Sequence, residues 1–284
     1  MKKVILSADS TCDLNDKIKE RYDIHCQPLH IHLNDKIYKD GVDITPDDIY
    51  DTYEKQRILP KTSAPNPKEY IDYFKQWTDK GYEVVHISLG SGISSSYQNA
   101  SLAAEQLGNV YPIDSGNLST GMGLLVIEAA ERIQKGMTAE QIFAEVNQLK
   151  ANVHASFVID TLTYLYEGGR CSALAAFSAN LLNIKPCIEV DHTSGNMNVG
   201  KKYRGSLTRV FKRYTLDQLR KHQSNLKLDR MFITHSGTSS ENIDLVKKTI
   251  EDTVNVKEIL VTRAGCTISS HCGPNTLGVL FMTN

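Results

Sequence analysis

Short apolar runs alternate with segments of helical periodicity through the first half of the chain. The runs KKVILSAD, YEVVHISLG and NVYPIDS contain the β-branched residues typical of buried strands. Helical patterns follow each run, near Asn15 to Arg21, up to Gln106, and twice more after the third run. Regular alternation of this kind predicts an α/β sheet.

Capping residues mark two helix starts. Asn66 stands before Pro67 and Glu69, and Thr138 stands before Gln141. An Asn or Thr followed three residues later by Glu or Gln is the pattern of a capping box, and proline suits the first helical position. Helices are therefore expected to begin at these two points.

The alternation of strand-like and helical segments changes beyond Ala155. Strand-like runs become more frequent, a hairpin-like stretch interrupts them, and three helices lie between them. The runs are ASFVIDTL, PCIEVD, RMFITHSG, EILVTRAG and LGVLFMTN, and the hairpin-like stretch is HTSGNMNVGKKYR. We therefore expect two α/β domains, residues 1–160 and 161–284, with no linker to mark the boundary.

The segment Cys171 to Ile184 contains no charged residue. If it is helical, apolar or small side chains surround it, so it must be buried. A core helix is the favoured interpretation. The alternative is that it forms a wall of an apolar ligand tunnel, because small residues leave room beside the backbone.

Length and charge limit the possible functions. The chain has 284 residues, with 32 Lys and Arg against 33 Asp and Glu and a net charge of −1. This balance lacks the basic excess of a nucleic-acid binder, and no apolar run approaches a membrane span. The start MKKVILSADS is too short in apolar residues for a signal peptide. We expect a cytoplasmic protein with no nucleic-acid partner and at most transient membrane contact.

Cysteines and histidines give little sign of a metal site. The six cysteines lie far apart without a CxxC pair, so they are expected to be small buried residues or free thiols. His30 and His32 would share one face of a strand near His25 and Cys26 and could ligate a metal. The simpler interpretation, adopted here, is an edge strand with its polar face in water, with no metal and no cofactor.

The stretch HISLGSGISSSYQNA combines a strand, a glycine turn and a helix start. This arrangement directs free helix N–H groups around Ser94, Ser95 and Ser96 beyond the end of the strand, where an anion can bind. The stretch is not a dinucleotide fingerprint because Ser95 occupies the place of the third glycine, and it lacks both the lysine of a P-loop and the GxSxG elbow. Taken alone, a serine-capped helix explains it.

Two other loops carry polar side chains that could join this site. In KTSAP, Thr62 and Ser63 lie in a non-helical stretch and offer hydroxyl donors. In SSHCGPNTLG, a glycine and proline turn carries His271 directly before the last strand. Side chains on loops of this kind can converge on one site.

As a set, the motifs resemble those of the DegV family over nearly the whole chain. They are ADSTCDL, TSAP, SLGSGISSSYQNA, VYPIDSGNLSTGMGLLV, YLYEGGRCSALAA, NIKPCIEV, KKYRG and HCGPNTLG, in family order. The resemblance implies two α/β domains of the DegV type with the ligand site at the interdomain junction. It implies a long-chain fatty acid as ligand, and a role as the fatty-acid-binding subunit of a bacterial fatty-acid kinase.

The resemblance also implies roles for individual residues. Hydroxyl groups and a histidine would bind the fatty-acid carboxylate, Arg170 would belong to the domain-junction loop, and Arg204 would dock the kinase. The carboxylate set is Thr62, Ser63, Ser94, Ser95 and His271, and the tunnel would be lined by Leu174, Phe177 and Leu181. The chain departs from the family pattern at Ser95, where glycine is usual, and at Ala64, where glutamine is usual.

The residue types suit this chemistry. Hydroxyls and helix N–H groups can satisfy a carboxylate without a buried cation, at ~1.5–3 kcal/mol per charge-assisted bond. The tail would contribute roughly 0.8 kcal/mol per buried CH₂. The kinase partner would bring ATP and magnesium, so the chain itself needs no phosphate loop and is not expected to be an enzyme.

Two other functions stay open at this point. A serine hydrolase or acyltransferase could use Ser94 as nucleophile and His271 as base, with Asp9, Asp114 or Asp160 as the orienting acid. A lipid-sensing regulatory protein would need the same ligand site without delivery.

The segment from Gly200 to Lys221 is locally basic. It holds eight basic residues against the single acid Asp217, in an otherwise nearly neutral chain. Such a cluster could steer an acidic partner, although about half of the positions are expected to be ordinary solvated helix sites.

Overall fold

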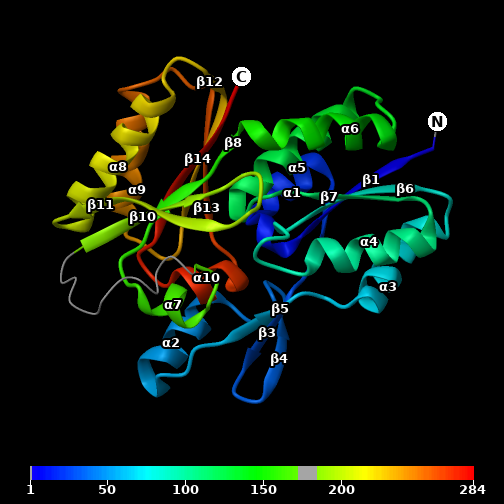
Figure 1. Ribbon diagram of the computed structural model, residues 1–284, viewed down its shortest axis with the longest axis horizontal. Coiled ribbons are helices and arrows are strands. Elements are labelled where there is room, and N and C mark those ends of the chain that lie inside the picture. Colours follow the sequence, from blue (N-terminus) through cyan, green and yellow to red (C-terminus); the bar gives the residue numbers. More distant parts are fainter. Residues whose placement is uncertain (1, 172–183) are drawn as a thin grey trace.

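Two α/β domains form the molecule (Figure 1). The structure, a computed structural model, describes residues 2–171 and 184–284. Two larger sheets stand on either side of a central helix, and a small third sheet extends from the base of the view. Within the described ranges, no helix is both long and apolar enough to cross a membrane.

The first sheet has four parallel strands in the order β2-β1-β6-β7. Helices cover both of its faces, which explains why its two central strands, β1 and β6, are almost entirely buried. The strands are β1 (Val4–Asp9), β2 (Ile24–Gln27), β6 (Glu83–Ser88) and β7 (Val110–Asp114). The helices are η1 (Ser10–Cys12), α1 (Asp16–Tyr22), α3 (Pro67–Thr78), α4 (Ser96–Leu107), α5 (Ser119–Gln134), α6 (Ala139–Leu149) and η2 (Lys150–Asn152).

The predicted helix starts are confirmed. Asn66 accepts a hydrogen bond from the backbone of Glu69, whose side chain accepts one from the backbone of Asn66. Thr138 and Gln141 form the same reciprocal pair at the start of α6. Each pair satisfies two N–H groups that the helix leaves free.

The small sheet is antiparallel and carries two of the candidate hydroxyls, those of Thr62 and Ser63. Its order is β4-β3-β5, and α2 (Pro46–Gln56) is inserted between β4 and β5. The strands are β3 (His30–Leu33), β4 (Lys36–Lys39) and β5 (Lys61–Ser63). The expectation that PLHIHLN is an edge strand is wrong, because β3 has a partner on each side.

The second sheet has seven strands and runs β11-β10-β9-β14-β12-β13, with β8 beside β14. Its strands are β8 (Val153–His154), β9 (Ser156–Val158), β10 (Ile184–Val190), β11 (Met197–Arg204), β12 (Leu226–His235), β13 (Glu258–Arg263) and β14 (Leu277–Thr283). Its helices are α7 (Thr163–Glu167), α8 (Leu207–His222), α9 (Ser240–Glu251) and α10 (Cys266–Cys272). The predicted hairpin is confirmed as β10 and β11. Since β8 and β9 precede residue 160, this sheet begins at Val153, and the division at 160 stays a prediction.

Helix α5 belongs to both domains. Every residue from Ser119 to Ala130 is buried. One apolar cluster runs from Val85 and Ile87 of β6 through α5 to Phe232 of β12 and Leu280 of β14. The two sheets therefore share a core, and segments at their junction are held in place from both sides.

One prediction falls outside the described residues. The uncharged segment is described only at Cys171 and Ile184. Its expected helix, and the tunnel-lining residues Leu174, Phe177 and Leu181, lie in the part that is not described.

Candidate functional site

A cavity of about 50 Å³ lies at the junction of the domains. Its lining comes from the small sheet, the serine loop, the start of α5, β9 and α10, together with Arg170 and Met197. The polar residues of the lining are Thr62, Ser63, Ser94, Arg170, Thr267 and His271. The apolar ones include Leu29, Leu89, Ile93, Leu118, Phe157, Leu165, Met197 and Ile268. The cavity is thus amphipathic, and it brings together four of the five predicted carboxylate residues and Arg170.

Thr62 and His271 form a hydrogen-bonded pair in this lining. Thr62 is the middle residue of β5, and its Oγ1 lies 2.8 Å from His271 Nε2. His271 lies in the last turn of α10, not in the loop that the sequence suggested. The glycine and proline turn follows the helix, because Gly273 ends it with a positive φ of 72° and an extended ψ of 173°.

Burial decides the protonation of His271. Burial, with a smaller contribution from the nearby Arg170 charge, lowers the pKa of His271 to about 4. The imidazole is therefore neutral near pH 7. If Nε2 carries the proton and donates to Thr62, the Thr62 hydroxyl is free to donate its own proton into the cavity.

The serine loop contributes Ser94 to the cavity but not Ser95. Helix α4 starts at Ser96, whose backbone N–H donates to Ser94 Oγ at 3.1 Å, and the two hydroxyls lie 3.0 Å apart. Ser95 is exposed and is not part of the cavity lining. Ser63 lines the cavity, but its Oγ also lies 2.8 Å from His32 Nε2.

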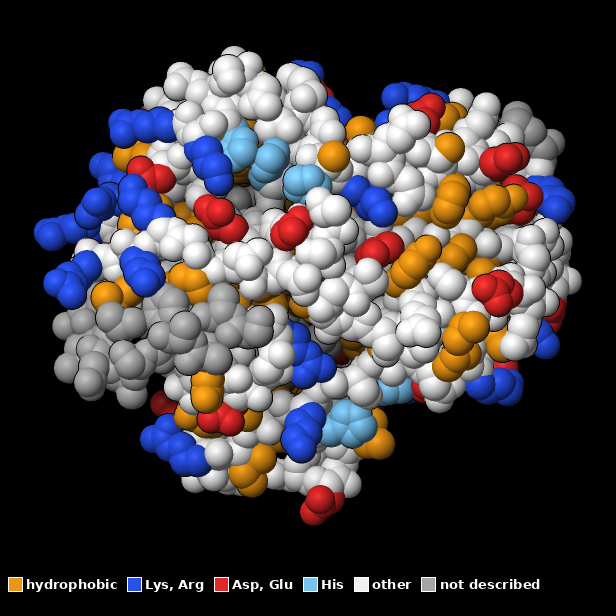
Figure 2. Space-filling model, in the orientation of Figure 1, with side chains coloured by type: hydrophobic (Ala, Val, Ile, Leu, Met, Phe, Trp, Pro, Cys, Tyr) orange, Lys and Arg blue, Asp and Glu red, His pale blue; other side chains and the backbone are white. Residues whose placement is uncertain are grey.

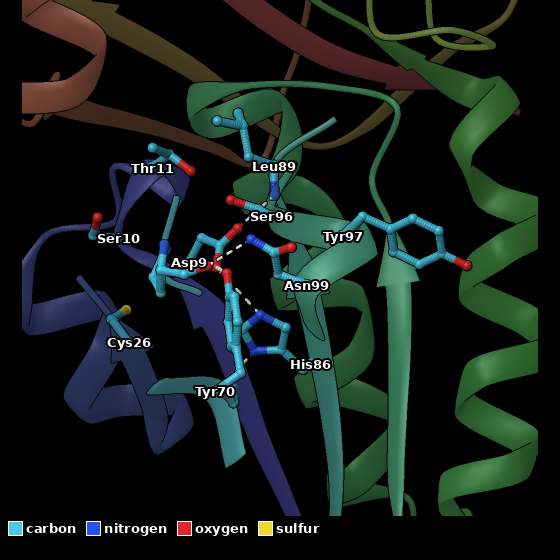
Figure 3. Close-up of polar contacts among 12 residues, drawn as sticks. Asp9, Ser10, Thr11, Cys26, Tyr70, His86, Leu89, Ser96, Tyr97 and Asn99 are labelled. Atoms are coloured by element: carbon cyan, nitrogen blue, oxygen red, sulfur yellow. Dashed lines mark hydrogen bonds and ion pairs between the residues drawn. The ribbon is translucent and has the colours of Figure 1, made fainter. Parts of the chain in front are cut away.

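A buried aspartate holds the start of the serine loop. Asp9, at the end of β1, accepts a hydrogen bond from the Leu89 backbone at 2.8 Å and one from the Tyr70 hydroxyl at 2.6 Å (Figure 3). His86 Nε2 lies 3.3 Å from the same carboxylate. Asp9, Tyr70 and His86 are all fully buried. The Asp9 side chain, which does not line the cavity, therefore holds the start of the serine loop in place.

Ser7, His86 and Asp9 are connected in the order of a hydrolase triad. Ser7 Oγ lies 2.8 Å from His86 Nδ1, and His86 Nε2 faces Asp9. All three side chains are fully buried, so no substrate can reach the serine. This chain of contacts supports the fold.

Close backbone approach explains the glycines of the serine loop. A side chain at Gly92 would place Cβ 2.1 Å from the Ser194 carbonyl oxygen, and one at Gly90 would place it 2.9 Å from the Asn117 nitrogen. Ser194 belongs to the turn between β10 and β11. Gly92 thus lets the second domain pack against the loop, and Gly90 lets the segment before α5 pack against it, roles that the sequence did not reveal.

Two buried polar atoms of the lining lack a partner among the described residues, Thr267 Oγ1 and His271 Nδ1. Unpaired buried polar groups cost ~1–3 kcal/mol each, so a ligand acceptor that reached the Thr267 hydroxyl would be favoured, whereas His271 Nδ1 in the tautomer described above can only accept a hydrogen bond. Thr267 was not predicted as a site residue. It lies four residues before His271, so a helix at Cys266–Cys272 would have placed both on one face.

A second cavity of about 20 Å³ adjoins the first. The two share the walls Leu118, Phe157, Ile268 and Cys272. These four side chains therefore stand between the two cavities.

The geometry does not match a serine hydrolase. His271 Nε2 is paired with Thr62, and Ser94 Oγ with Ser96. The predicted orienting acids are engaged elsewhere, Asp9 as above, Asp114 with Ser91 and Asp160 with Lys185. Among the described residues no carboxylate contacts His271 Nδ1.

The histidines of β3 have protein partners. His30 Nε2 lies 2.9 Å from a Glu69 carboxylate oxygen, and His32 pairs with Ser63. In the part of the chain that is described, no group of three or more His, Cys, Asp or Glu side chains is arranged to hold a metal ion.

Arg170 and Arg204 occupy different surfaces. Arg170 lines the cavity, and its Nη1 donates to the Gly168 carbonyl at 2.8 Å. Arg204 is exposed at the end of β11. Figure 2 shows Lys and Arg side chains gathered at the left edge of the molecule, over β11 and α8.

The fold and the site together define a two-domain α/β protein with a small amphipathic cavity at the domain junction. The chain belongs to the DegV family, because the family model described as "Uncharacterised protein, DegV family" matches residues 3–284. A DegV domain-containing protein of Clostridium perfringens is 31% identical over 284 residues, which cover 99% of each chain.

Solved structures show the same fold. A DegV family protein from Thermus thermophilus, whose structure concerns fatty-acid binding, is similar with a TM-score of 0.91 and 28% identity over 99% of this chain and 100% of that one. A stearic-acid-binding protein from Eubacterium ventriosum has a TM-score of 0.84 and 25% identity over 100% of this chain and 98% of its own. Fatty-acid binding is therefore an activity found within this family.

Proposed function

We propose that this protein binds a long-chain fatty acid, with the carboxylate at Thr62, Ser94 and His271 and the tail along the apolar walls. The observation that carries the proposal is the cavity lining, in which hydroxyls and a neutral imidazole stand beside aliphatic and aromatic side chains. The solved relatives whose structures concern fatty-acid binding support it. Thr62 and Ser94 supply the donors that a carboxylate requires.

Binding of a long tail requires the cavity to open. Pockets for ligands of this size typically have volumes of roughly 300–1,000 Å³, well above the volume enclosed here. Leu118, Phe157 and Ile268 separate the two cavities and would have to move apart. Burial of the tail would contribute roughly 0.8 kcal/mol per CH₂, so the sum over a long tail would exceed the cost of a few rotamer changes.

Lipid extraction tests the proposal. Protein purified from lipid-replete cells should release about one fatty acid per chain on denaturation, and native mass spectrometry should show the matching mass difference. Protein that is empty and does not bind added palmitate or oleate would contradict the assignment. The Ser95→Ala variant serves as a matched control, because Ser95 is exposed beside the cavity.

We further propose that the protein presents the bound carboxylate to a fatty-acid kinase for acyl-phosphate formation. The support is the basic surface around Arg204, which is exposed together with Arg209, Lys212, Arg213 and Arg220. An acidic partner would be steered to such a surface. The six cysteines, all of which lie in the described residues, form no disulfide, which favours a reducing compartment and hence a cytoplasmic location.

Charge substitution separates docking from ligand binding. The Arg204→Ala variant should retain fatty-acid affinity but slow acyl-phosphate formation with the cognate kinase and ATP, and added salt should slow the wild-type reaction. Lys247→Ala, which removes an exposed cation from α9, is the matched control. Wild-type rates for Arg204→Ala across a salt series would refute the docking role.

A further inference from the structure

Two of the six cysteines lie in contact. Cys12 ends η1, and Cys26 lies in β2, where it pairs in register with Ala8 of β1. Because η1 folds back beside the end of β2, the two Sγ atoms are 3.9 Å apart. A disulfide needs an S–S distance of about 2.05 Å, so rotation of the two side chains must close roughly 2 Å.

The two thiols are unequal. Cys12 is buried in the core, whereas Cys26 is the one cysteine of the six that is not buried. A hydrogen bond from the Cys12 thiol lowers the pKa of Cys26 against the effect of burial, and Lys19 lowers it further. The same contact, together with burial, raises the pKa of Cys12 well above its ordinary value. Cys26 is therefore the more reactive thiol, with Cys12 behind it as the second.

We propose that Cys12 and Cys26 form a site of reversible oxidation, at which a hydroperoxide converts the two thiols into a disulfide. In the first step the Cys26 thiolate attacks one peroxide oxygen, which gives a sulfenic acid and releases hydroxide that takes up a proton as water. The Cys12 thiol then attacks the Cys26 sulfur and displaces a second water. Two thiols and one hydrogen peroxide thus give one disulfide and two waters, and a dithiol reductant reverses the change.

The pair lies where the segments of the candidate site are anchored. Figure 3 shows Cys26 just below the turn that carries Ser10 and Thr11. On one side of that turn Asp9 holds the Leu89 backbone, and on the other Asp13 accepts from the Gly265 backbone at 2.8 Å, before α10. Ser10 Oγ accepts from the Leu29 backbone at 3.2 Å. Closure of the bond would pull on all three contacts. The second part of the proposal is that the disulfide weakens fatty-acid binding through these contacts, and this part rests on the proposed fatty-acid site.

Thiol chemistry on the intact protein tests the first part. Hydrogen peroxide should lower the mass by two hydrogen atoms, remove two of six titratable thiols, and yield a linked peptide pair containing Cys12 and Cys26, all reversed by dithiothreitol. Cys26→Ser should abolish the link, whereas Cys187→Ser, which removes a buried thiol elsewhere, should not. Retention of all six thiols, or oxygen added to Cys26 without a bond to Cys12, would overturn the proposal.

Fatty-acid affinity tests the second part. We expect the disulfide form to bind palmitate about fivefold more weakly than the reduced form, the effect of losing one hydrogen bond at the site. Cys26→Ser should bind with equal affinity before and after peroxide. Equal affinity of the two wild-type forms would overturn the link to the site. The mass and peptide results do not depend on fatty-acid binding, so failure of the proposed function would be recognised separately.

Discussion

At the scale of single residues, the polar end of the cavity is built from neutral groups. Thr62, Ser63, Ser94 and Thr267 offer hydroxyls, and the low pKa of His271 keeps its imidazole uncharged near neutral pH. Arg170 is the one formally charged side chain among the described lining residues. A site of this kind can hold a carboxylate through hydrogen bonds and still let the ligand leave, because no buried ion pair must be broken.

Removal of one donor should weaken binding of the acid. Ser94→Ala is expected to weaken palmitate binding by ~1–3 kcal/mol, or roughly 5- to 150-fold, and binding of methyl palmitate by less. Titration calorimetry or competition with a fluorescent fatty acid measures both. Ser95→Ala should leave both affinities unchanged. Equal losses of affinity for the acid and the ester would mean that Ser94 does not distinguish the charged carboxylate from the neutral ester.

Asp13 should make stability depend on pH. Burial raises its pKa to about 8, although Ser119 Oγ–H and the Gly265 N–H donate to it and oppose the rise. A raised pKa in the folded state gives stability that is complete below the unfolded pKa near 4 and is lost as pH rises through 8. Urea unfolding should therefore show a loss of about 2 kcal/mol between pH 6 and 8.5. Asp13→Asn should remove most of this slope, and an unchanged slope would assign it to other groups.

At the scale of elements, the capping signals were read correctly, whereas the partners of β3 were not. The capping boxes at Asn66 and Thr138 depend on residues within one turn, so the sequence contains all that is needed. The position of β3 depends on β5, which pairs His30 with Ser63 across an inserted helix. Nothing near His30 in the chain indicates that partner, and the edge-strand prediction failed for this reason.

The residues of the candidate site were also predicted only in part. Thr62, Ser94 and His271 were named from motifs, and the structure brings them to one cavity. Thr267 was missed because SSHCGP was interpreted as a turn, which hid the one-turn spacing to His271. Ser95 was included because it is adjacent to Ser94, yet the helix start turns it outward. Side-chain direction follows from element boundaries, which are the least certain part of a sequence-based prediction.

The serine loop should not tolerate a side chain at Gly92. The Cβ would lie 2.1 Å from the Ser194 oxygen, which is backbone and cannot move independently of the β10–β11 turn. Gly92→Ala is therefore expected to lower the free energy of unfolding by about 1–3 kcal/mol and to weaken ligand binding by displacing Ser94. Thermal unfolding and fatty-acid titration measure the two effects. Wild-type values for both would show that the two loops separate easily.

At the scale of the whole molecule, the two domains are joined by packing and by charge. Glu128 is buried on α5 and contacts Arg132 of its own helix and Lys227 and Arg230 of β12. Burial opposes its charge, yet hydrogen bonds from Lys227 and Arg132 keep the pKa of Glu128 below its ordinary value. The cluster connects the central helix to the second sheet beside the shared core.

Loss of the Glu128 charge should weaken this connection. Glu128→Gln leaves three cations close together, and because these are partly exposed we expect a cost of about 1–3 kcal/mol in the free energy of unfolding. Glu20→Gln, on the exposed face of α1, is the control and should cost little. Denaturant titrations of both variants decide the matter, and equal stabilities would show that the cluster contributes nothing.

The shared position of α5 also has a consequence for synthesis on the ribosome. The helix is complete at Gln134, but the strands that cover its second face begin only at Leu226 and Leu277. A nascent chain that has finished its first sheet therefore carries an uncovered apolar helix face until β12 and β14 have been synthesised. During that interval the face is a natural target for chaperones and for premature association with other chains. We therefore expect the first half of the chain, when made alone, to expose the apolar face of α5 that β12 and β14 otherwise cover.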